Sequence, residues 1–136
     1  MTKYILDSGI VSLILDEAEP VYSHYRDLKT DGHRIGIGTP VLGELLAGLQ
    51  HSQSKQKNLT KLRMMLKTLT IWSYNESAAE EYAKIKAHLR SIGRKIQEVD
   101  LQTAAISRTL RNCTVVTMDS DFAAIPGLNI ENWMTP

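Results

Sequence analysis

The sequence is poor in the features that mark several classes of protein. Its 136 residues include one cysteine, Cys113, which excludes both an intramolecular disulfide framework and a cysteine-rich zinc site. No apolar run approaches the ~20 residues of a membrane-spanning helix, and the first residues lack the long apolar segment of a signal peptide. We therefore expect a protein of the cytoplasm that has no membrane partner.

An excess of charge of one sign is also missing. The chain has 16 Lys and Arg against 15 Asp and Glu, a net charge of +1. This balance neither indicates nor excludes a nucleic-acid partner, because local patches of charge matter more than the total. The apolar share of 43% is sufficient for one buried core, and we expect a single domain over residues 1–136.

Short apolar segments alternate along the chain with longer amphipathic ones. The short segments predict strands at 3–6, 34–38, 70–74, 114–118 and 127–133. The amphipathic segments predict helices at 8–17, 20–32, 40–50, 55–69, 76–93 and 100–112, with Ser8 at or near the cap of the first and Thr39 as the cap of the third. This alternation is typical of an α/β domain, and we expect a mostly parallel sheet of four or five short strands with helices on both faces.

Four acidic residues are expected at one edge of this sheet. Asp7 and Asp119 follow strands directly, and parallel strands all end at the same edge. Asp100 begins a helix that runs antiparallel to the next strand, and Glu44 lies about one turn into the helix after strand 34–38. Carboxylates gathered without histidine or cysteine are typical ligands of Mg²⁺ or Mn²⁺.

Each acid taken alone also has a simpler explanation. An aspartate after a strand often only caps a helix, and a single glutamate such as Glu44 is often a solvated helix residue. The pair Asp119 and Asp121 is common in turns. The expected convergence of four acids is what favours a metal site.

Four segments together resemble the PIN domain and, more narrowly, the VapC-type ribonuclease toxins of toxin–antitoxin pairs. The segments are YILDSGIVSLIL, TPVLGELLAGL, EVDLQTAAIS and VVTMDSDFAAIPGLNIENW, and they span nearly the whole chain in the order of that family. The resemblance implies an endoribonuclease that depends on Mg²⁺ or Mn²⁺ and cuts RNA with a metal-activated water. It also implies an antitoxin protein as partner and a homodimer.

The resemblance assigns roles to individual residues. Asp7, Glu44, Asp100 and Asp119 become the catalytic and metal-binding acids. Asp121, Ser8 and Thr117 match secondary positions beside the site.

Two residues depart from the pattern of the family. Gly9 stands where the family usually has asparagine, and Thr103 stands where it usually has an apolar residue. Because Gly9 removes a hydrogen-bonding amide, the alternative is a catalytically weak or inactive module of the same fold that binds RNA or protein.

An RNA substrate would also require basic residues near the acids. Arg94 and Lys95 precede Asp100 closely in the sequence and are the predicted RNA contacts. The basic helix at 55–69 is either a solvated face or a second contact with RNA.

Overall fold

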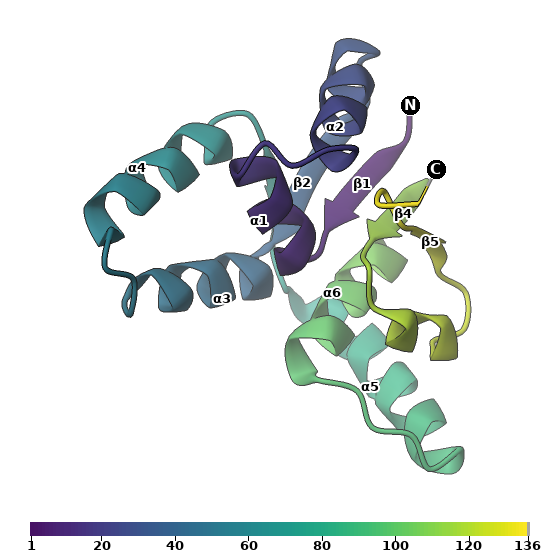
Figure 1. Ribbon diagram of the computed structural model, residues 1–136. Helices are drawn as coiled ribbons and strands as arrows, with labels where there is room; N and C mark the ends of the chain where they lie inside the picture. The colour runs from purple at the N-terminus through teal and green to yellow at the C-terminus, as the bar shows by residue number, and fades with distance from the viewer. Residues whose placement is uncertain (136) are drawn as a thin grey trace.

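Five parallel strands form one sheet in the order β3-β2-β1-β4-β5 (Figure 1). The computed structural model describes residues 1–135, so the last residue of the domain expected over 1–136 lies outside the described residues. The strands are β1 (Lys3–Leu6), β2 (Arg34–Gly38), β3 (Thr70–Trp72), β4 (Cys113–Val116) and β5 (Asn129–Glu131). All four pairings are parallel, which confirms the predicted sheet.

The helices also occur where the sequence predicts them, although several end earlier. They are α1 (Ser8–Leu15), α2 (Val21–Thr30), α3 (Thr39–Leu49), α4 (Lys55–Leu66), α5 (Glu76–Ser91) and α6 (Glu98–Thr109). A short 3₁₀ helix, η1 (Ser120–Ala124), was not predicted. Its aspartate cap and small residues are equally typical of a turn, so sequence periodicity gives no signal for it.

Three predicted helix starts, those of α2, α3 and α6, differ by one or two residues from the observed ones, whereas α1 begins at Ser8 as predicted. Asp7 is the cap of α1, next to Ser8, and Gly38 occupies the cap position of α3 that was predicted for Thr39. The Thr39 hydroxyl instead accepts a hydrogen bond from the backbone of Tyr74. Helix α6 begins at Glu98, so Asp100 lies in its first turn and not at its start.

Side chains alternate between the two faces of the central strand and build two cores. Tyr4 and Leu6 point into a core to which α1, α2, α3 and α4 contribute. Ile5, between them, points into a second core with residues of α5, α6 and η1. This period of two is that of a strand buried on both faces.

One close approach brings α3 and α6 together at the carboxyl edge of the sheet. At Gly38, which ends β2, an added Cβ would lie 2.7 Å from Cδ1 of Ile106 in α6. The missing side chain therefore lets α6 pack against the beginning of α3. Glu44 on α3 and Asp100 on α6 are carried toward the same edge by this packing. Within residues 1–135, no helix has the length and apolar character that crossing a bilayer requires.

Candidate active site at the carboxyl edge of the sheet

Asp7 is held in place by hydrogen bonds from two parts of the chain. Its Oδ1 accepts from the backbone N–H of Ser8 at 2.7 Å, and its Oδ2 accepts from the Thr117 hydroxyl at 2.8 Å. The backbone N–H of Asp7 donates to the carbonyl of Val116 at 2.9 Å, so the ends of β1 and β4 are joined directly. Both carboxylate oxygens are thus oriented, and hydrogen bonds of this kind favour the ionised form.

Asp119 is connected to Asp7 through the same hydroxyl. The backbone N–H of Asp119 donates to Thr117 Oγ1 at 3.0 Å, while Asp119 Oδ1 accepts from the backbone N–H of Asp121 at 2.9 Å. The second bond caps η1. The Thr117 hydroxyl therefore contacts Asp7, whereas Ser8 contacts Asp7 through its backbone N–H and not through its hydroxyl.

Asp100 has a strongly raised pKa because it is buried close to other acids. Its exposed fraction is 9%, and burial is the main cause that raises its pKa from 3.8 to about 7. The charges of four acids raise that pKa further, in the order Asp7, Asp119, Glu44 and Asp121. The fold therefore brings the other four acids of the prediction within electrostatic range of Asp100.

The pKa of Asp7 shows the same excess of negative charge. Burial raises it first, and the hydrogen bonds from Thr117 and Ser8 partly offset that effect. The charges of Glu44 and Asp119 then raise it again. Mutual repulsion of this kind is relieved by protonation or by a cation.

Asp121 differs from the other acids because it already has a cationic partner. Arg94 Nη2 lies 2.8 Å from Asp121 Oδ1. Both side chains are largely exposed, so the pair adds little to stability but fixes where Arg94 lies. Arg94, and with it the loop that also carries Lys95, is thereby placed beside the acids.

The donor chemistry of the acid cluster fits a hard divalent cation. All five side chains present carboxylate oxygens, which are the ligands that Mg²⁺ and Mn²⁺ prefer. As they stand, however, no three Asp, Glu, His or Cys side chains within residues 1–135 form a group that could hold a metal ion. The acids therefore lie near one another without already forming a closed site, and the metal stays a prediction.

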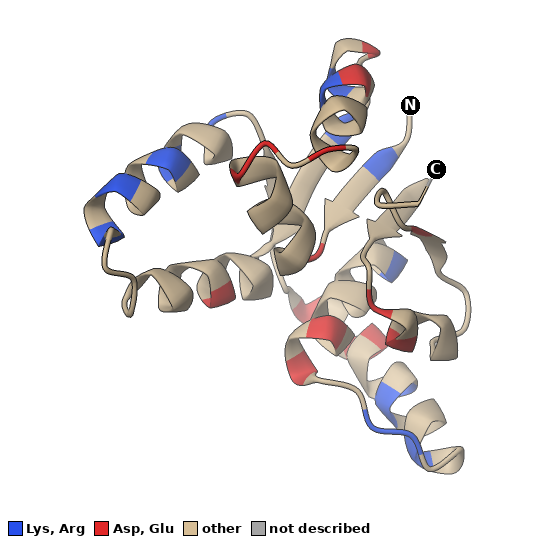
Figure 2. Ribbon diagram, in the orientation of Figure 1, with Lys and Arg blue, Asp and Glu red and all other residues tan. Residues whose placement is uncertain are grey.

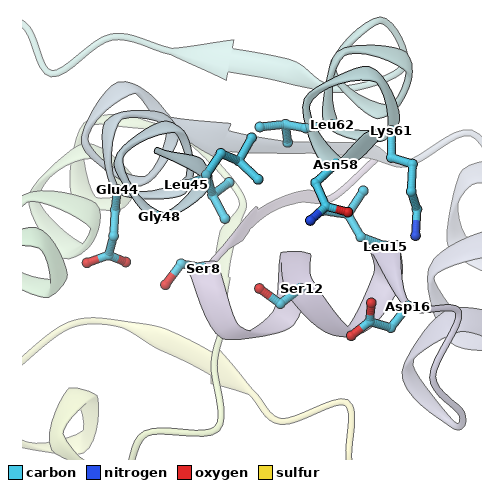
Figure 3. Close-up of a pocket in the computed structure, with 11 residues that line it drawn as sticks. Ser8, Ser12, Leu15, Asp16, Glu44, Leu45, Gly48, Asn58, Lys61 and Leu62 are labelled. Carbon is cyan, nitrogen blue, oxygen red and sulfur yellow. The ribbon is translucent and has the colours of Figure 1, made fainter. Parts of the chain in front are cut away.

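A groove extends from the acid cluster between α1, α3 and α4. Its volume is about 520 Å³. Its lining is Ser8, Ser12, Leu15, Asp16, Glu44, Leu45, Gly48, Leu49, Asn58, Lys61 and Leu62. Figure 3 shows the Glu44 carboxylate and the Ser8 hydroxyl at one end of the groove, with Lys61 and Asp16 at the other. An apolar interior with a polar rim is suited to an amphipathic partner.

Two features of the site were not found from the sequence. Met118 is 46% exposed, and its Cε lies 3.4 Å from where a Cβ on Gly9 would be, so it partly covers the position of the missing asparagine. The hydroxyl of Thr103, one turn beyond Asp100, is buried without a hydrogen-bond partner in residues 1–135. The position of Met118 and the environment of the Thr103 hydroxyl both depend on side-chain packing, which the sequence does not show. The only signal in the sequence is that Gly9 and Thr103 depart from the family pattern.

Comparison with known proteins supports the relationship suggested by the sequence. Residues 4–128 match the model of the PIN domain family. The chain is 30% identical over 131 residues to ribonuclease VapC2 of Rickettsia felis, covering 96% of this chain and 97% of that protein. It is 27% identical over 134 residues to the tRNA(fMet)-specific endonuclease VapC of Shigella flexneri, covering 98% and 99%.

A solved structure shows the same architecture. The chain superposes with a TM-score of 0.89 on a chain of VapBC2 from Rickettsia felis bound to a DNA fragment from its promoter. The two chains are 28% identical, and the match covers 97% of this chain and 99% of the other.

Proposed function

Since the chain belongs to the PIN domain family and, within it, to the VapC proteins, we propose that it is the metal-dependent endoribonuclease of a toxin–antitoxin pair. The observation that carries this proposal is the gathering of Asp7, Glu44, Asp100 and Asp119 at one sheet edge. The raised pKa of Asp100 supports it, because burial and, after it, the charges of four acidic neighbours raise that pKa. Repulsion within a cluster of this kind lowers the stability of the fold, so its presence indicates a function such as cation binding or catalysis.

The chemistry proposed is hydrolysis of a phosphodiester bond. Asp7, Asp100 and Asp119 would hold Mg²⁺ or Mn²⁺, with Glu44 beside them. When bound, the ion supplies positive charge that makes water a better nucleophile and offsets charge developing on the phosphoryl oxygens. Attack of water on phosphorus and breakage of the bond to the 3′ oxygen leaves a 5′-phosphate and a 3′-hydroxyl.

The residues of the chain have separate tasks in this reaction. Thr117 keeps Asp7 oriented through its hydroxyl, and it positions the backbone of Asp119 at the same time. Glu44 projects into the open end of the groove, where its carboxylate is available to accept a proton from water (Figure 3). Burial and the neighbouring acids raise the pKa of Asp100 to about 7, so a proton and a cation would compete for its carboxylate.

Cleavage of RNA and arrest of growth test this function together. The purified protein should shorten RNA in Mg²⁺ or Mn²⁺, with unfractionated tRNA included because one relative is a tRNA-specific endonuclease. Asp7→Asn should reduce cleavage at least a hundredfold and remove growth arrest, while Asp27→Asn, a change of the same kind on the exposed face of α2, should alter neither. Binding of RNA without cleavage by the parent protein would favour the alternative of an inactive module.

An antitoxin is the expected protein partner, and the groove offers it a place. Several neighbours in structure are VapBC complexes, which contain such a partner. We propose that an apolar helix of the antitoxin lies in the groove and that an arginine or lysine beside it reaches Glu44 and Asp7. Raising Mg²⁺ should then weaken inhibition, and Glu44→Gln should change the affinity of the antitoxin. Inhibition insensitive to both would place the partner elsewhere.

We also propose that the chain forms a homodimer. Leu46 on α3 and Met64 on α4 are exposed apolar residues on two helices that contact each other. Sedimentation at tens of micromolar should give a dimer, and Leu46→Glu should weaken it. A monomeric parent would contradict the proposal.

A further inference from the structure

A second hollow, lined by basic residues, lies on the opposite side of the acid cluster from the groove. It has a volume of about 350 Å³ and lies between the second half of α5, the loop that follows it and the start of α6. We call it the basic cleft, and its lining is Lys86, Leu89, Arg90, Arg94, Lys95, Ile96, Glu98 and Leu101. Figure 2 shows this concentration of Lys and Arg along α5 and the loop below the acidic start of α6.

Two of the four bases are held by acids, and two are not. Lys86 Nζ lies 2.7 Å from Glu98 Oε1, and Arg94 is paired with Asp121. Within residues 1–135, Arg90 and Lys95 have no carboxylate within 4 Å, and both side chains are exposed. The cleft therefore has a net positive charge, which favours an anionic ligand.

The bottom of the cleft is part of the second core. Leu89, Ile96 and Leu101 are buried members of the second core, which fixes the backbone from which the bases project. Bases near the end of a helix also complement its dipole, which is a simpler explanation for Arg90. That explanation does not extend to Lys95, which lies in the loop beyond α5.

The cleft adjoins the proposed catalytic acids by direct contacts. Arg94 reaches from the lining to Asp121, whose backbone donates to Asp119, and Leu101 in the lining follows Asp100 in the chain. An RNA strand that enters the acid cluster brings negative charge to a surface that repels it. Cations beside the acids are needed to offset this repulsion.

We infer that the basic cleft binds a backbone phosphate of the RNA substrate that flanks the phosphate to be cut, with Arg90 and Lys95 as its ligands. The inference rests on the proposed ribonuclease function. Arg94, tied to Asp121, keeps the cleft aligned with the acids. The cleft thus positions the RNA and contributes no group to the bond-breaking step.

The test compares two charge-matched double variants for binding to unfractionated tRNA, in a chelator so that no cleavage occurs. Arg90→Gln with Lys95→Gln removes the two unpaired bases of the cleft. Arg34→Gln with Arg111→Gln removes two exposed bases at the opposite, amino edge of the sheet. The cleft variant should bind about tenfold more weakly at low salt, and its slope of log affinity against log salt should fall in magnitude by about 0.8, as the loss of one neutralised phosphate predicts. The control should bind like the parent.

A charge-conserving variant separates charge from structure. Arg90→Lys with Lys95→Arg keeps both charges and should keep tRNA affinity within about threefold of the parent. Equal affinities of the cleft variant and the amino-edge control would overturn the inference and leave the cleft to a protein partner. If the parent neither binds tRNA nor cuts RNA, the ribonuclease proposal itself fails and this inference falls with it.

Discussion

The Thr117 hydroxyl donates a 2.8 Å hydrogen bond to Asp7 Oδ2, joining residues that are 110 positions apart in the sequence. The same oxygen accepts the backbone N–H of Asp119. One buried hydroxyl therefore sets the positions of two of the proposed catalytic acids. Removing this hydroxyl should therefore lower both the stability and the activity of the protein.

Thr117→Val should show this coupling. The valine keeps the shape but leaves Asp7 with one hydrogen bond fewer and the Asp119 N–H without its partner. We expect a loss of about 2 kcal/mol in the free energy of unfolding, measured in urea, and at least a tenfold fall in RNA cleavage. Thr117→Ser, which retains the hydroxyl, should stay within about threefold of the parent in cleavage. Valine and serine variants with the same activity would show that the bond is incidental.

Asp100 should make the metal-free protein less stable as the pH rises. Its pKa is raised from 3.8 to about 7 in the folded state, so the folded protein binds the proton more tightly than the unfolded chain. The stabilisation from this proton is complete below about pH 4 and is lost as the pH rises through 7. As the pH rises from 4 to 8, the free energy of unfolding of Asp100→Asn should therefore increase relative to that of the parent by about 2 kcal/mol, after allowance for solvent screening. Urea unfolding in a chelator measures this, and parallel curves for the two proteins would contradict it.

Divalent cations should stabilise the fold by relieving repulsion among the acids. At a concentration of Mg²⁺ or Mn²⁺ about 100 times its Kd, mass action gives about 2.7 kcal/mol, or roughly a 10 °C rise in Tm for a domain of this size. Asp100→Asn should lose most of this gain, whereas Asp27→Asn on α2 should keep it. A parent whose melting curve does not respond to either cation would argue against a shared metal site.

Gly9→Asn should restore the amide that the family usually has at this position. An added Cβ would meet only the flexible end of Met118, at 3.4 Å, so the substitution should change Tm by no more than about 3 °C. We expect cleavage of RNA to rise severalfold because the amide can hydrogen-bond to the neighbouring carboxylates. Gly9→Ala adds the Cβ without the amide and should leave cleavage near the parent rate. An asparagine variant no faster than the alanine variant would refute the role of the amide.

Thr103→Val should stabilise the protein. The Thr103 side chain is 1% exposed, and its hydroxyl has no hydrogen-bond partner in residues 1–135. Replacing a buried, unpaired hydroxyl by a methyl group of the same size should add about 1 kcal/mol to the free energy of unfolding. Thr103→Ser, which keeps the hydroxyl and creates a small cavity, should destabilise. A destabilised valine variant would reveal a bridging water or other partner of the hydroxyl.

The order of strands and helices could be predicted from the sequence because it follows from the local periodicity of apolar residues. β1 and β2 have the predicted bounds, and each of the six predicted helices is present. The ends of the elements were less predictable. Strand 70–74 ends at Trp72 and the helix predicted to Leu69 ends at Leu66, because hydrogen bonds and packing, and not composition, decide where a periodic segment stops.

The sequence also determined which acids would gather. Asp7, Glu44, Asp100 and Asp119 could be assigned to one edge because parallel strands end together, a property of topology that needs no coordinates. Their resemblance to a known family pointed to the same four positions.

Only the tertiary structure decided how these acids interact. The bond between Thr117 and Asp7, the pairing of Arg94 with Asp121 and the unpaired hydroxyl of Thr103 depend on distances of a few ångströms between segments far apart in the chain. The basic cleft has the same origin, because Arg90 and Lys95 share a surface with Lys86 only once α5, its loop and α6 have packed together. Sequence periodicity fixes which face a side chain occupies, but contact between two side chains follows from how the elements pack.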